Sequence, residues 1–158
     1  MNSAFHVVAI DGGAGTGKST TASLLSKRLN FLHVDTGSHY RSLTKHLLDK
    51  EISFPMLDSY LEQNNILLTS EVKEDRSLLA INGVVYASDL LRTAEVNHAV
   101  SNFASNPKVR QILFSYQREQ IEVARSENKS GLVMEGRDIG TVIYPDADLK
   151  VFLVADQK

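Results

Sequence analysis

The sequence predicts an α/β fold in which helices cover both faces of a parallel β-sheet. The first observation is a β-branched apolar run at 7–10, followed by a glycine-rich loop and a helical pattern. The second is that strand-like and helix-like segments alternate twice within about the first fifty residues, as expected when crossover helices join parallel strands. With 158 residues, the chain is long enough to bury one sizeable core.

The spacing of the apolar residues predicts the individual helices and strands. Apolar residues three and four positions apart indicate a helix, and short apolar runs indicate a strand. Asn30 is expected to end the first helix, and Asn106 with Pro107 to begin a long one as N-cap and first-turn residue. Outside the middle of the chain, the expected strands are 7–10, 31–34, 131–134 and 149–154, and the expected helices are 20–29, one ending near 50, 91–104 and 107–126.

The middle of the chain breaks this alternation. A short helix is expected at 55–64, and strands at 66–69, 77–81 and 84–86. Asn82-Gly83, between the last two strands, is a strong hairpin signal because both residue types accept a positive φ. We therefore expect residues 52–92 to form a small antiparallel insertion, and residues 1–51 and 93–158 to form the core domain.

Composition narrows the function classes. Apolar residues at 42% and charged residues at 23% are ordinary for a globular protein. A net charge of −2 gives no general attraction to nucleic acid or to an anionic membrane, and the absence of cysteine excludes disulfides and thiolate metal sites. No apolar run approaches the length of a membrane span and no signal-peptide pattern is found. We expect a cytoplasmic monomer with no nucleic-acid or membrane partner.

The glycine-rich loop matches the phosphate-binding pattern G-x-x-x-x-G-K-[ST] over Gly12 to Ser19. Glycines let successive backbone N–H groups curl around phosphate oxygens, and the following helix adds its positive N-terminal end. Lys18 would reach the β- and γ-phosphates, and the Ser19 hydroxyl would bind Mg²⁺. The alternative is a glycine loop that merely turns the chain. The candidate ATP-binding residues are Gly12, Gly13, Ala14, Gly15, Thr16, Gly17, Lys18, Ser19 and Thr20.

Polar residues follow two further predicted strands at the edge where ligands bind in open α/β sheets. Asp35-Thr36 follows the second strand, and Glu135 to Asp138 follows the strand at 131–134. Alone, Asp35 could be a helix N-cap, and Arg137 with Asp138 a loop ion pair. Beside a phosphate loop, however, a strand-end carboxylate can hold Mg²⁺ directly or through water. The candidate metal ligands are Ser19, Glu135 and Asp35.

Arginines are candidates for a second phosphate, because a guanidinium grips phosphate through two hydrogen bonds. The candidates are Arg41, Arg110 and Arg137, although a solvated surface position is the ordinary alternative for each. His39 is expected to be structural rather than catalytic. No arrangement suggests a covalent nucleophile, so alignment and charge neutralisation would carry a phosphoryl transfer.

Four stretches of the chain closely resemble the bacterial cytidylate (CMP) kinases, and the resemblance covers the whole chain. The stretches are Asp35-Thr36-Gly37-x-x-Tyr40-Arg41, Leu91-Arg92-Thr93-x-Glu95-Val96, Glu135-Gly136-Arg137-Asp138-Ile139-Gly140-Thr141-Val142 and Pro145-Asp146-Ala147. The resemblance implies an adenylate-kinase-like fold of the P-loop NTPase type, with 52–92 as the nucleoside-monophosphate-binding insertion. It implies transfer of a phosphoryl group from MgATP to CMP or dCMP, with Lys18 and Arg137 catalytic. The substrate-binding residues it implies are Thr36, Tyr40, Arg41, Ser101, Arg110, Arg137 and Asp138.

Two departures from the family pattern qualify the resemblance. Gly13 stands where the family commonly has proline, which loosens the loop but removes no phosphate contact. The family also continues into an arginine-bearing lid and a C-terminal strand and helix, which we expect to begin at about Asp156-Gln157-Lys158 and which this sequence does not include. One alternative is therefore a nucleotide-binding fragment without catalysis. Another is a related small-molecule kinase of adenylate or shikimate type.

Overall fold

The structure, a computed structural model, describes residues 4–156, so Gln157 and Lys158 of the expected lid start lie outside the described residues. The strands are β1 (His6–Gly12), β2 (Phe31–Asp35), β3 (Leu68–Lys73), β4 (Arg76–Ile81), β5 (Gly131–Gly136) and β6 (Leu149–Leu153). The helices are α1 (Lys18–Leu29), α2 (Thr36–Asp49), α3 (Leu57–Gln63), α4 (Ala94–Ser105), α5 (Pro107–Arg118) and α6 (Gln120–Ser126). Short turns of helix are η1 (Phe54–Met56), η2 (Leu90–Arg92) and the π-helical η3 (Ile139–Ile143).

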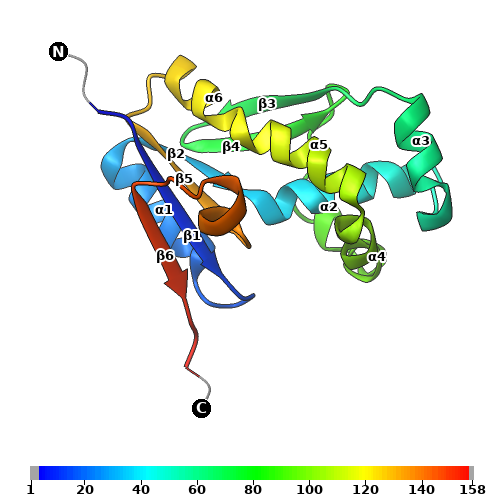
Figure 1. The fold of residues 1–158 in the computed structure, drawn as a ribbon, viewed down its shortest axis with the longest axis horizontal. Helices are drawn as coiled ribbons and strands as arrows, with labels where there is room; N and C mark the ends of the chain where they lie inside the picture. The colour runs from blue at the N-terminus through cyan, green and yellow to red at the C-terminus, as the bar shows by residue number, and fades with distance from the viewer. Residues whose placement is uncertain (1–3, 157–158) are drawn as a thin grey trace. The chain divides into compact units, whose positions relative to one another are not determined.

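The strands form one sheet in the order β3-β4-β2-β5-β1-β6 (Figure 1). Strand β5 lies between β2 and β1 and runs parallel to both, and β6 runs parallel to β1. In this register Glu135 on β5 is paired with Ile10 on β1 and with Asp35 on β2. The predicted α/β fold with a mainly parallel sheet is therefore confirmed, and the carboxyl ends of three strands meet at one edge.

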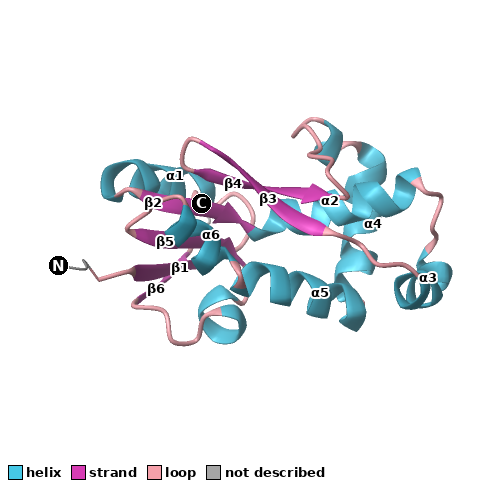
Figure 2. Cartoon of the chain, turned by 90° about the horizontal axis from the view of Figure 1, so that it is seen from above, coloured by secondary structure: helices cyan, strands magenta, loops and turns pink. Residues whose placement is uncertain are grey.

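Both faces of the sheet are covered, as predicted. Successive residues of β1 point to opposite faces, so Val8 and Ile10 pack with Ala22 of α1 while Ala9 packs in a second cluster. That second cluster includes Ala124 of α6 together with side chains of η3 and the residue after it. Figure 2 shows the strands side by side in the sheet. Burial on both faces explains why β1 and β5 are continuously apolar in sequence.

The chain divides into two compact units. The first comprises Met1–Gly37, Val72–Ser77 and Gln117–Lys158, and contains the phosphate loop with β1, β2, β5 and β6. The second comprises Ser38–Glu71 and Leu78–Tyr116 and has its own apolar core. Strands β3 and β4 fall inside the predicted insertion, yet β4 pairs with β2 through Arg76 and His33. The boundaries 52 and 92 of a separate insertion stay a prediction.

The predicted turn at Asn82-Gly83 is present, but the strand predicted after it is wrong. Asn82 and Gly83 have φ values of 49° and 82°, and Ile81 and Val84 exchange backbone hydrogen bonds of 2.9 and 3.0 Å. Beyond that single bridge, 85–86 are not in a strand. The sheet neighbour of β4 is instead β3, across a two-residue turn in which Glu74 adopts a φ of 55°. No glycine marks this turn, so composition did not reveal it.

The long helix predicted to run to 126 begins as expected and is interrupted. Asn106 caps it, because its side-chain oxygen accepts from the backbone N–H of Lys108 at 2.8 Å. The interruption lies at Glu119, between α5 and α6. The Tyr144 hydroxyl lies 3.0 Å from the carbonyl oxygens of both Gln117 and Arg118. A tertiary side chain therefore satisfies carbonyls released by the break, which no local pattern could predict.

Burial of His39 makes the free energy of unfolding depend on pH. The side chain is fully buried and packs edge-on against Tyr116, with ring centroids 5.1 Å apart, which fits a structural role. Burial disfavours the imidazolium and lowers the pKa of His39 to about 3. Below pH 6.5 the unfolded chain therefore takes up a proton that the folded chain refuses, so stability falls as the pH falls.

We expect the contribution of His39 to decrease by about 2 kcal/mol between about pH 7 and pH 5. Urea denaturation at the two pH values measures it. His39→Gln should flatten the dependence, whereas His98→Gln, at an exposed histidine, should leave it unchanged. Equal pH dependence in the parent and His39→Gln would contradict the assignment.

Candidate functional site

The phosphate loop connects β1 to α1 in a conformation that depends on its glycines. Gly15 and Gly17 have φ values of 73° and 88°, in the left-handed region that glycine enters without steric cost. A Cβ on Gly12 would lie 2.5 Å from the carbonyl oxygen of Leu153 on β6. Nothing lies within 4 Å of a Cβ built on Gly13. The loop therefore has room at this position for a side chain, such as the proline that the family commonly has.

The charged end of Lys18 lies at the loop itself. Its Nζ donates to the carbonyl oxygen of Gly13 at 2.7 Å, and the Thr16 hydroxyl donates to the same oxygen at 2.7 Å. Lys18 and Ser19 are the first residues of α1, so their N–H groups belong to the free end of the helix. Backbone donors, helix end and ammonium group are thus gathered where the pattern predicts an anion.

Glu135, at the end of β5, is only 2% exposed and has a partner on each carboxylate oxygen. The Ser19 hydroxyl donates to Oε1 at 2.6 Å, and His33 Nε2 lies 2.5 Å from Oε2. The backbone carbonyl of Glu135 accepts from the Thr36 hydroxyl at 2.9 Å. Two of the three predicted metal ligands, Ser19 and Glu135, are therefore in direct contact. The third, Asp35, lies opposite Glu135 in the backbone register of β2 and β5.

The oxygens of Ser19 and Glu135 fit the chemistry of Mg²⁺. Mg²⁺ prefers hard oxygen donors, and it commonly takes one or two protein ligands while water and phosphate oxygens complete its shell. Within residues 4–156, no group of three or more His, Cys, Asp or Glu side chains forms a ready-made metal cage. A site that shares its metal with a nucleotide phosphate is consistent with both facts.

The loop after β5 is held by Asp11, which is not among the predicted site residues. Its two carboxylate oxygens accept from the backbone N–H groups of Ile139 and Gly140, at 2.7 and 2.9 Å. Arg137 and Asp138 are exposed in this loop, and Asp138 has a left-handed φ of 60°. Asp11 therefore ties the start of the phosphate loop to the segment that carries these two predicted substrate ligands. An acid directly before a glycine loop was the available signal.

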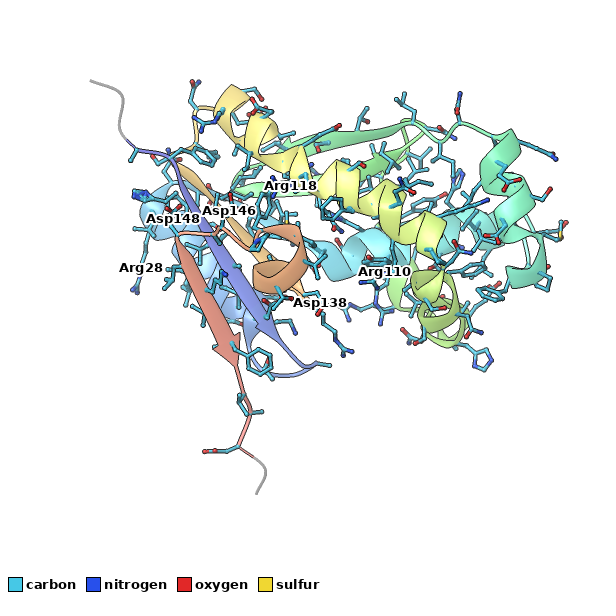
Figure 3. All side chains as sticks on the ribbon, viewed as in Figure 1. Arg28, Arg110, Arg118, Asp138, Asp146 and Asp148 are labelled. Carbon is cyan, nitrogen blue, oxygen red and sulfur yellow. The ribbon has the colours of Figure 1, made fainter. Side chains whose placement is uncertain are left out.

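Two aspartates and an arginine, labelled in Figure 3, contact the segment around η3 and β6. Asp148 accepts from the backbone N–H of Val7 at 2.7 Å. Arg118 donates to the carbonyl oxygen of Ile143 at 2.7 Å and lies 3.9 Å from the Asp146 carboxylate. These contacts belong to the first unit, and they hold the chain on both sides of the 145–147 motif.

The remaining predicted substrate residues belong to the second unit. Arg41 donates to the carbonyl oxygen of Leu91 at 2.9 Å and to the Asn97 side chain at 2.5 Å. Ser101 on α4 and Arg110 on α5 are exposed, and Tyr40 is half-buried. Arg41 thus connects two of the stretches that carry the family resemblance, 35–41 and 91–96. The roles of these residues toward a substrate stay a prediction.

Comparison with known proteins decides the family. The model of the family described as "Cytidylate kinase" matches residues 8–158. The chain belongs to the cytidylate kinase family. It is 39% identical over 152 residues to a cytidylate kinase of Chloroherpeton thalassium, which covers 96% of this chain and 62% of that protein. A cytidylate kinase of Bacillus thuringiensis is 36% identical over 149 residues, covering 94% of this chain and 63% of that protein.

Cytidylate kinase membership confirms the resemblance carried by the 35–41, 91–96 and 135–142 stretches. The chain spans 62% to 63% of the length of these two cytidylate kinases. Among solved structures, one from Thermus thermophilus titled "Crystal structure of TT1252" matches with a TM-score of 0.42 and 16% identity, covering 97% of this chain and 67% of that one. Within the part of the chain that the structure describes, no helix is long and apolar enough to cross a membrane.

Proposed function

We propose that the protein containing this chain transfers the γ-phosphoryl group of MgATP to CMP or dCMP, giving ADP and CDP or dCDP. The observation that supports this most is the contact between Ser19, the last residue of the phosphate-loop pattern, and the buried Glu135, at 2.6 Å. It brings a magnesium-type oxygen pair next to Lys18 in a chain of the cytidylate kinase family.

Residues of the first unit would have separate roles in phosphate binding, magnesium binding and charge neutralisation. The loop N–H groups and the Lys18 ammonium would hold the β- and γ-phosphates. Ser19 and Glu135 would hold Mg²⁺, which when bound neutralises charge on the phosphates. Arg137 would add a permanent positive charge for the transferring phosphoryl group or the acceptor phosphate. The acceptor oxygen is already an anion, so alignment suffices without a covalent enzyme intermediate.

Substrate selection is assigned to residues that the family resemblance indicates. Arg41 and Arg137 would bind the CMP phosphate, and Ser101, Arg110 and Asp138 would read the base. For Asp138 a chemical argument supports the role, because a carboxylate accepts from the cytosine amino group, which uracil lacks. Thr36 and Tyr40 would line the same pocket.

Asp138→Ala should reduce the preference for CMP over UMP and leave ATP binding nearly unchanged. Discrimination built on a hydrogen bond is large when the site would leave its polar group unpaired, so we expect a loss of at least about tenfold in the ratio of kcat/KM values. Turnover of CMP and UMP is compared in parent and mutant. An unchanged ratio would mean that another residue reads the base.

Phosphoryl transfer from labelled ATP tests the proposal and separates it from its rivals. The acceptors are CMP, dCMP, AMP, UMP and shikimate, with the 158-residue polypeptide and the full-length natural protein assayed side by side. Transfer to CMP or dCMP above the other acceptors supports the proposal. Transfer to AMP or shikimate would favour a related kinase, and binding without transfer by both proteins would favour a non-catalytic nucleotide-binding role.

A further inference from the structure

The contact between His33 and Glu135 indicates a role that neither the motifs nor the family match assigns. We infer that His33 is a positioning residue, which holds one oxygen of Glu135 so that the other faces Ser19 and the magnesium position. The inference rests on the proposed function, because it concerns how Glu135 would bind Mg²⁺. It starts from two side chains that are 4% and 3% exposed and lie 2.5 Å apart.

The proposed role in magnesium binding sets the direction of the hydrogen bond between His33 and Glu135. A carboxylate that binds Mg²⁺ is ionised and only accepts hydrogen bonds, so in the magnesium-binding form the proton between His33 Nε2 and Glu135 Oε2 belongs to the imidazole. His33 Nδ1 is buried and has no hydrogen-bond partner among the described residues, so no second hydrogen bond there competes for the ring's orientation. His33 is therefore expected to carry a proton on Nε2, which it donates to Glu135.

The two partners of Glu135 differ in how firmly they are held. A serine hydroxyl can rotate and can redirect its proton when a cation arrives, since its oxygen also has lone pairs. His33 has less freedom, because its side chain is buried and its backbone lies in β2, paired with Val133 on one side and Arg76 on the other. Its backbone N–H also donates to the carbonyl oxygen of Asp75 at 2.6 Å. The more restrained partner, His33, thus holds Oε2, and the more adaptable Ser19 faces Oε1.

Contacts of the β3–β4 turn and of β4 hold in place the strand that pairs with His33. Asp75 also forms an ion pair with Lys129 at 3.0 Å, and Ser77 donates to Gln120 of α6 at 2.6 Å. These contacts, all within the first unit, anchor the strand that pairs with His33. A buried imidazole on a strand that is paired on both sides is suited to orienting a flexible glutamate, which otherwise has three torsions to restrain.

Matched substitutions separate positioning from mere packing. In His33→Gln the amide nitrogen takes about the place of Nε2 and keeps the donor, whereas in His33→Asn the shorter amide does not reach Glu135. His46→Asn, at a buried histidine of the second unit, controls for loss of a buried imidazole. The measurement is the Kd of AMP-PNP by titration calorimetry, with saturating Mg²⁺ and with EDTA, with urea denaturation to compare the stability of each variant.

We expect His33→Asn to reduce the Mg²⁺-dependent gain in AMP-PNP affinity about 10- to 100-fold, the usual range for losing the partner of a metal-binding side chain. The Kd in EDTA should change little, and His33→Gln and His46→Asn should retain the gain. Equal weakening of binding by His33→Asn in Mg²⁺ and in EDTA would overturn the positioning role. A parent protein with no Mg²⁺-dependent gain would overturn the proposed function, and the inference with it.

A second measurement needs no substitution, and it applies if His33→Asn does not fold. Nitrogen-15 NMR of the imidazole in the parent protein reports which ring nitrogen carries a proton. We expect a proton on Nε2 of His33 with the downfield shift of a strong hydrogen bond. An unprotonated Nε2 would overturn the inference, because the ring could then only accept.

Discussion

Lys18→Ala should lower phosphoryl transfer to CMP by at least about 10²–10³-fold, the range for losing one group that stabilises charge in a transition state. The Lys18 ammonium contacts only the carbonyl oxygen of Gly13 among the hydrogen bonds of the loop. The side chain is half-buried and takes no part in the apolar clusters, so its loss opens no core cavity. Steady-state kinetics of the full-length protein measure the effect.

Lys27→Ala provides the matched control, because Lys27 is exposed in the last turn of the same helix. It should leave both kcat and the midpoint of urea denaturation unchanged. Lys18→Ala should share the unchanged midpoint while losing activity. An active Lys18→Ala protein would refute the assignment of Gly12–Ser19 as the site of phosphoryl transfer.

Gly136→Ala should destabilise the fold by about 3 kcal/mol or more, since steric overlap and an unfavourable φ act together. Gly136 has a φ of 156°, and a Cβ there would overlap the Thr36 hydroxyl oxygen. That hydroxyl is itself held by the carbonyl oxygen of Glu135, so it cannot move away without losing a buried hydrogen bond. Urea denaturation of parent and mutant measures the change.

The overlap with Thr36 can be tested by a double-mutant cycle. Gly136→Ala should cost less in a Thr36→Ala background, because the overlapping oxygen is then absent. Gly13→Ala, where nothing lies within 4 Å of the new Cβ, should have almost no effect on stability. Equal costs of Gly136→Ala in both backgrounds would show that the backbone angle, rather than the contact with Thr36, requires glycine.

The parts of the fold that were predictable are those encoded by local chemistry. Asn30 ends α1 in a left-handed conformation with a φ of 57°, and Asn106 and Asn82-Gly83 act as their residue types predict. The break at Glu119 and the placement of β4 beside β2 were not predictable, because each depends on a partner distant in sequence. Tyr144 and His33 are those partners.

In the candidate site, too, residues that belong to a local motif were predictable, and residues that act through distant partners were not. The phosphate loop and Glu135 lie at the carboxyl ends of predicted parallel strands, so a parallel sheet predicts that Ser19 and Glu135 lie near one edge. Asp11 and His33 are different, because their side chains act on residues more than a hundred positions away in the chain. A lone histidine in an apolar strand carries no spacing signal. The glycine loop after Asp11 marks that acid, but it does not show which residues the acid contacts.

The length of strand β5 cannot change without altering the position of Glu135. Its residues are paired on both sides, with Leu132 opposite Val7 on β1 and Leu32 on β2. Side chains alternate between faces, so deleting one residue before Glu135 would turn that carboxylate to the other face of the sheet. Glu127 and Asn128, in the turn before β5, are exposed and take no part in this strand pairing. Insertions and deletions that evolution accepts near this site should therefore fall in that turn, and substitutions rather than length changes should account for variation within the strand.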